Sequence, residues 1–151
     1  MRKALYLALA VVGCGKAETP AADSVAPAAP PPAAPAALTA ADVRGTWNGT
    51  SKREGTDSTV NFTVISTTDS TGKVVFGRDS VNTTSKIDGD SIVVTSAPYN
   101  DPTAPRNTPR VVFRSVGRLK DGKLVGMAYI SPAAKPDTVI GRATWEATRA
   151  P

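Results

Sequence analysis

Apolar and polar residues alternate with a period of two along most of the chain after residue 42. Val60, Phe62 and Val64 are separated by polar residues, and Val74 and Phe76 repeat the same two-residue spacing across Val75. This pattern is typical of a strand buried on one face, because successive side chains of a strand point to opposite sides. The same criterion predicts strands over residues 43–50, 60–64, 73–76, 92–94, 111–116, 124–130 and 139–147. We expect seven or eight short strands, and no window shows the periodicity of a long helix.

Turn residues between these runs predict that consecutive strands form hairpins. Asp88-Gly89 and Asp121-Gly122 each lie between two apolar runs, and Asp-Gly suits a tight turn whose central residues have positive φ. Thr71-Gly72 is expected to close a third hairpin. The resulting fold class is all-β, an antiparallel meander that closes as a small barrel, with a β-sandwich as the alternative.

One predicted strand, residues 124–130, is apolar on both faces. Val125, Met127 and Tyr129 share the face opposite to Leu124 and Ile130. Only one face of a barrel strand points inward. The second face is therefore covered by a neighbouring layer or a proline-rich loop, or it forms an exposed apolar patch that meets a partner or ligand.

Two proline-rich segments interrupt the strands. Residues 96–109 contain four prolines and one aromatic residue, Tyr99, and residues 131–137 contain two prolines. Loops on a rigid scaffold often carry recognition residues. Tyr99 is therefore a candidate binding residue, whereas we expect the second segment to be a stiff connection.

The first residues have the features of a cleaved export signal. Arg2 and Lys3 precede an apolar run over residues 4–12, and the small Gly13 directly precedes Cys14, the only cysteine. The run is too short for a permanent transmembrane helix, which takes about 20 apolar residues.

Val11-Val12-Gly13-Cys14 resembles the lipobox of bacterial lipoproteins, with valine where leucine is more common in the first position. The resemblance implies cleavage before Cys14, a diacylglyceryl group on its sulfur and usually an acyl group on the new amine. It thus implies a lipid-anchored protein of the bacterial cell envelope. Gly15 replaces the aspartate that commonly retains such proteins in the inner membrane, which favours the outer membrane.

An alanine- and proline-rich stretch over residues 16–41 separates this motif from the predicted strands. Proline disfavours helix interiors and favours extended polyproline II segments, so we expect a disordered, extended tether. The predicted organisation is a signal peptide at 1–13, a lipidated Cys14 with linker at 14–41 and a β domain at 42–151.

Composition narrows the possible chemistry. The formal net charge is +5, and loss of Arg2 and Lys3 with the leader would lower it by two. The remaining basic residues are scattered without the basic stripe expected of a nucleic-acid-binding protein. The chain has no histidine and its single cysteine is assigned to the anchor, so we expect no metal site, no cofactor and no enzymatic activity.

Gly45-Thr46-Trp47, on the first predicted strand, resembles the Gly-x-Trp motif of lipocalins and lipocalin-like barrels. The resemblance implies that Trp47 packs across the base of the barrel beside an arginine that follows the last strand. Arg149 is in the matching position. Simple core filling is the alternative explanation of Trp47.

The sequence therefore predicts a lipid-anchored envelope protein whose non-enzymatic β domain binds a small apolar ligand. The alternative is an interaction or assembly protein that binds another protein or a cell-wall polymer through a sheet surface. The candidate binding residues are Trp47, Tyr99, Val125, Met127 and Tyr129.

Overall fold

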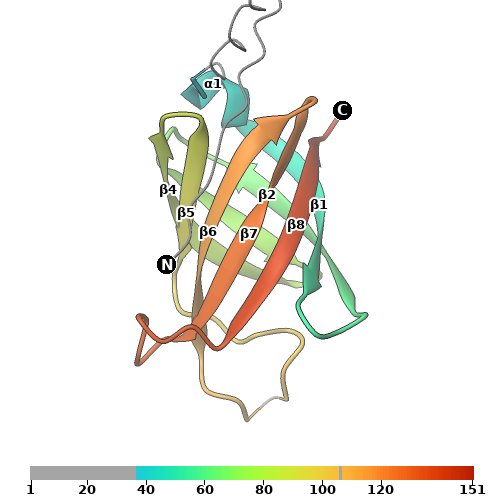
Figure 1. Ribbon diagram of the computed structural model, residues 1–151, viewed down its shortest axis with the longest axis vertical. Helices are drawn as coiled ribbons and strands as arrows, with labels where there is room; N and C mark the ends of the chain where they lie inside the picture. Colours follow the sequence, from blue (N-terminus) through green and yellow to red (C-terminus); the bar gives the residue numbers. More distant parts are fainter. Residues whose placement is uncertain (1–36, 106) are drawn as a thin grey trace, which may run out of the picture. The chain divides into compact units, whose positions relative to one another are not determined.

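The residues that the structure describes form a closed barrel of eight antiparallel strands, joined in the order of the sequence (Figure 1). The computed structural model describes residues 37–105 and 107–151, so the expected leader, Cys14 and most of the expected linker lie outside it. The strands are β1 (Gly45–Arg53), β2 (Thr59–Ser66), β3 (Thr71–Phe76), β4 (Asp79–Asp88), β5 (Ser91–Ser96), β6 (Val111–Lys120), β7 (Lys123–Pro132) and β8 (Gly141–Arg149). The predicted all-β barrel is confirmed, and the sandwich alternative is wrong.

Closure depends on the pairing of the first strand with the last. Gly49 of β1 lies opposite Phe62 of β2 on one side and opposite Ala147 of β8 on the other. Every strand therefore has two neighbours, and the sheet has no edge strand. Side chains alternate between the interior and the outer surface along each strand, which is why the period-two pattern located most of them.

A short segment before the first strand closes one end of the barrel. It contains the helix α1 (Ala40–Val43), and its Val43 and the preceding Leu38 are buried. The Leu38 amide donates to the Gly89 carbonyl of the β4–β5 turn, at 3.0 Å. The Asp42 carboxylate accepts hydrogen bonds from the Thr39 hydroxyl and amide, which lower the pKa of Asp42. Packed structure thus begins ahead of the boundary expected at residue 42.

Trp47 is the most deeply buried large side chain of the described residues, with 2% of its surface exposed. Its indole nitrogen donates to the Val43 carbonyl at 3.0 Å, and the Arg149 guanidinium lies 4.6 Å from the ring centre. Arg149 also donates to the Arg44 and Asp42 carbonyls, at 2.6 and 2.7 Å. Trp47 and Arg149 therefore occupy the places at the barrel base that the lipocalin resemblance implies.

The turns follow the prediction only in part. Asp121 and Gly122 both have positive φ, 51° and 76°, and form the expected two-residue turn between β6 and β7. Between β4 and β5, Asp88 instead pairs with Ser91, so the predicted turn is displaced by one residue. The third hairpin also forms, because Val64 of β2 pairs with Val74 of β3. Its loop spans residues 67–70, however, and Thr71 and Gly72 lie in β3 rather than in the turn.

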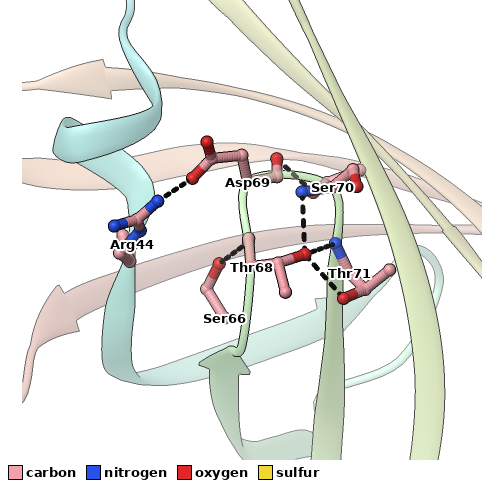
Figure 2. A network of polar contacts seen from close by, with 7 residues as sticks. Arg44, Ser66, Thr68, Asp69, Ser70 and Thr71 are labelled. Atoms are coloured by element: carbon pink, nitrogen blue, oxygen red, sulfur yellow. Dashed lines mark hydrogen bonds and ion pairs between the residues drawn. The ribbon is translucent and has the colours of Figure 1, made fainter.

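The β2–β3 loop is held by side-chain hydroxyls rather than by glycine (Figure 2). The Thr68 hydroxyl accepts from the amides of Ser70 and Thr71, at 3.3 and 3.0 Å, and contacts the Thr71 hydroxyl at 2.7 Å. Asp69 forms an ion pair with Arg44 on the segment that closes the barrel. Both partners are well exposed, so this pair contributes little to stability.

Two differences from the predicted strands have identifiable reasons. The whole of β4 was missed, because its inward positions include Thr83, which is buried, and Ser85 in place of large apolar residues. The strand predicted from residue 139 begins instead at Gly141. Val139 and Ile140 are 47% and 52% exposed in the preceding loop.

Candidate ligand cavity

The interior of the barrel is filled at the α1 end and hollow toward the other. Leu38, Val43, Trp47, Ile92, Leu124 and Ala147 form the buried cluster of the filled end. A second cluster, built on Val74, Val111, Phe113 and Ile130, lies around the hollow part. Phe62, Val64 and Val94 pack against both clusters and connect the two halves.

The hollow part is an apolar cavity of about 140 Å³. Its wall comes from seven strands together with the β5–β6 loop, and most of its surface is aliphatic or aromatic. The large side chains in the wall are Phe62, Phe76, Tyr99, Phe113, Ile130 and Trp145. Ala128 and Ala143, which pair with each other on β7 and β8, contribute small side chains to the same wall.

The aromatic residues of the wall form a continuous packed set. Phe62 contacts Phe76 and Trp145, with ring centres 6.4 and 6.3 Å apart. Tyr99 stacks on Phe76 at 5.9 Å and meets Phe113 edge-on at the same distance. These arrangements are favourable for aromatic pairs, so the wall facing the cavity is preorganised without a ligand.

Trp145 separates the cavity from the filled half, because it lines the cavity and also packs against the buried cluster. Its six-membered ring lies over two glycines, Gly117 and Gly126, where a Cβ atom would come within 2.5 and 2.6 Å of it. Among the described residues, the indole nitrogen has no hydrogen-bond partner, although it is buried. A buried unpaired donor is unfavourable, so this tryptophan contributes shape and apolar surface rather than a hydrogen bond.

The β5–β6 loop covers the open end of the barrel, opposite α1 (Figure 1). Tyr99 fixes its start through two backbone hydrogen bonds with Val111, both at 2.9 Å. Arg110 donates to the Pro98 carbonyl at its other end. Asp101, Pro102 and Thr103 of this loop line the cavity.

One ion pair connects the loop to the barrel at the mouth. The Nη1 atom of Arg53, the last residue of β1, lies 3.1 Å from Oδ2 of Asp101. The arginine side chain is 32% exposed and the aspartate side chain 9%. The pair is thus partly shielded from water, which strengthens it relative to a surface pair.

Tyr99 contributes a titratable phenol to the cavity wall. Burial, and next the Asp101 carboxylate, raise the pKa of its phenol above the ordinary value. The phenol is therefore neutral at any physiological pH, and its ring serves as apolar surface.

The predicted site residues separate into three places. Tyr99 lines the cavity, whereas Trp47 lies at the closed base and is absent from the cavity wall. Val125, Met127 and Tyr129 point outward from β7, since Leu124, Ala128 and Ile130 take the inward positions. Of the five predicted site residues, the structure therefore places only Tyr99 in the cavity wall.

The outer face around β7 is a half-buried apolar strip on the surface of the barrel. Val93, Val116 and Met127 lie opposite one another on β5, β6 and β7. Tyr129 lies next to Arg142 of β8, whose guanidinium carbon is 5.9 Å from the ring centre. The described strands form one closed barrel, so no second sheet among them covers this face, and the expectation of a sandwich layer is wrong. The proline-rich loop lines the mouth of the cavity.

Sequence reasoning missed Arg53, Asp101 and Trp145 as cavity residues. Trp145 carries a signal in the sequence, since it occupies the inward phase of the last predicted strand. The ion pair of Arg53 with Asp101 has no signal in the sequence, because the two residues are 48 positions apart and meet only through barrel closure.

Within the described ranges, no group of three or more histidine, cysteine, aspartate or glutamate side chains is arranged to hold a metal ion. No helix among residues 37–105 and 107–151 is long and apolar enough to cross a membrane.

Comparison of the chain with protein-family models, with curated proteins and with solved structures gave no match.

Proposed function

We propose that the β domain is a non-enzymatic binding module that holds one small apolar ligand inside the barrel. The observation that carries this proposal is the apolar cavity of about 140 Å³ under the β5–β6 loop. Filling a barrel completely with side chains would be more stable, since empty volume forfeits dispersion contacts. A preorganised apolar cavity is best explained by an occupant.

The size of the cavity limits that occupant. An apolar cavity of roughly 150 Å³ takes up a group the size of benzene, and pockets for drug-sized ligands are roughly 300–1,000 Å³. The wall offers mainly van der Waals contact, with hydroxyls such as Ser51 and Ser115 as minor polar points. We therefore expect a short alkyl chain or a single ring, with any larger remainder at the mouth.

Octanol is a suitable probe of this proposal, and calorimetric titration of the purified full chain is the measurement. The chain carries Cys14→Ser, so that no acyl group attached to the protein itself competes with octanol for the apolar cavity. We expect saturable binding of one octanol per chain. Ala128→Phe, which places a ring in the cavity, is expected to weaken binding by about tenfold or more.

Thr95→Phe is the matched control for Ala128→Phe. It adds a ring on the exposed outer face of β5 and leaves the cavity unchanged, so octanol affinity should stay at the level of the parent chain. Absence of saturable binding in the parent chain, or equal binding by the Ala128→Phe variant, would contradict the proposal.

We also propose that this domain is attached to the bacterial cell envelope, with the outer membrane favoured, by lipid on Cys14 and the linker over residues 14–41. The support is the lipobox-like motif at residues 11–14 and the export signal before it. Two or more acyl chains suffice for durable anchoring.

A second candidate function uses the outer strip around β7. Its half-buried Val125, Met127 and Tyr129 lie on the barrel surface, where a protein of the envelope can dock. In this alternative the ligand cavity is incidental and the module serves assembly.

A photocrosslinking residue at position 127 tests this alternative in intact cells. If the strip is an interface, we expect one dominant crosslinked species from position 127 and none from position 50, on the outer face of β1. Equal yields at the two positions, or no product at either, would exclude a specific interface at the strip.

A further inference from the structure

Arg53 places a single guanidinium at the mouth of an otherwise apolar cavity. It and Asp101 are the only charged residues among those that line the cavity. Asp101 belongs to the β5–β6 loop. The partner that neutralises Arg53 is therefore on a loop, whereas the other elements of the cavity wall are strands.

The fold leaves room for this guanidinium. A Cβ atom at Gly141, the first residue of β8, would lie 2.8 Å from Nη2 and 3.2 Å from Nε of Arg53. Both hydrogen bonds of the Arg53 side chain to described residues use Nη1, with Asp101 and, at 3.5 Å, Thr103 as acceptors. Nη2 and Nε thus remain as unused donors within the described part of the chain.

Asp101 can leave Arg53 without losing all its hydrogen bonds. Its Oδ1 atom accepts from the Thr103 amide at 2.9 Å and from the Thr103 hydroxyl at 2.7 Å. Only Oδ2 faces the guanidinium. If the loop moved away, the carboxylate would keep its local partners and regain water, whereas Arg53 would lose its counter-charge.

We propose that the ligand is an amphiphile with one apolar tail and one carboxylate head, whose carboxylate replaces that of Asp101 on Arg53. This inference rests on the proposed function and names the class of its ligand. The tail occupies the cavity, the head stays at the mouth, and the guanidinium binds it through two parallel hydrogen bonds. A cationic head would be repelled by the Arg53 guanidinium. A neutral head would leave this guanidinium without a counter-charge once the loop moves.

Calorimetric titration of the Cys14→Ser full chain with octanoate, octanol and octylamine tests this inference. The readout is the ratio of octanoate affinity to octanol affinity, which cancels general effects on the cavity. Loss of a charge-assisted bidentate contact is expected to lower that ratio about tenfold or more in Arg53→Gln. Asp101→Asn, which weakens the competing anion, is expected to raise it, and octylamine is expected to bind most weakly.

Lys52→Gln is the matched control, since Lys52 neighbours Arg53 and points outward in an exposed ion pair with Asp57. It removes the same charge and should leave the ratio unchanged. Gly141→Ala keeps the charge but displaces the guanidinium, so it should lower the ratio even if Arg53→Gln does not fold.

The outcomes separate the two proposals. Saturable octanol binding with a ratio that is equal in the parent, Arg53→Gln and Gly141→Ala chains overturns the carboxylate inference and leaves the cavity function intact. A fall of the ratio in Lys52→Gln as large as in Arg53→Gln also overturns it. If neither octanol nor octanoate binds to the parent chain, the proposed function itself is refuted.

Discussion

Replacing Trp47 by alanine is expected to lower the free energy of unfolding by about 3–5 kcal/mol, the range for truncating a buried aromatic residue. The side chain is 2% exposed, and it donates to the Val43 carbonyl and lies under the Arg149 guanidinium. It therefore connects α1, β1 and β8 at the closed end. Urea denaturation of the full chain, followed by circular dichroism, measures the change.

A matched pair of variants isolates the polar part of this contribution. Trp47→Phe and Trp145→Phe make the same chemical change, but only Trp47 has a hydrogen-bond partner among the described residues. Trp145→Phe removes an unpaired buried donor, so we expect Trp47→Phe to be the more destabilising by about 1–2 kcal/mol. An equal or opposite ranking would show that the Trp47 geometry contributes no net polar stabilisation.

Lipidation of Cys14 is the second prediction with a large expected effect. In bacterial cells producing the full chain, we expect the mature protein to lack residues 1–13 and to carry a diacylglyceryl thioether on Cys14. Each buried acyl CH₂ contributes about 0.8 kcal/mol to membrane binding, so two or more chains should place all of the protein in the membrane fraction. Intact-mass analysis of the purified product measures both the cleavage and the added lipid.

Cys14→Ser is the control for this experiment. Without the sulfur, no thioether forms and the mass added by lipid should be absent. Mass is more decisive than fractionation, because an uncleaved apolar leader can itself hold a chain at a membrane. A wild-type product with an unmodified Cys14 thiol, or with residues 1–13 still attached, would remove the basis for the envelope assignment.

The sequence by itself determined the class of fold through local rules. Alternation located most strands because the buried face of a strand must be apolar, as at Val60, Phe62 and Val64. Asp121-Gly122 specified its turn because few other residues adopt positive φ in succession. Where the inward positions of a strand hold small polar side chains, as the buried Thr83 and the half-buried Ser85 of β4 do, this signal is lost and the strand was missed.

The residues of the candidate site were much harder to predict from the sequence than the fold. Tyr99 was found because it is the single aromatic residue of a proline-rich loop, and the structure places it in the cavity wall. Val125, Met127 and Tyr129 were singled out by the doubly apolar pattern of β7. That pattern cannot tell which face points inward, and these three residues point outward.

Only the tertiary structure decided whether the barrel is hollow and what lies at its mouth. A cavity is the difference between the volume enclosed by eight strands and the volume of all inward side chains, so no single segment encodes it. The meeting of Arg53 with Asp101 likewise depends on closure of β1 against β8 and on the path of the loop. Local alternation and turn chemistry act over a few residues, whereas enclosed volume and charge pairing across 48 residues arise only when the whole sheet closes.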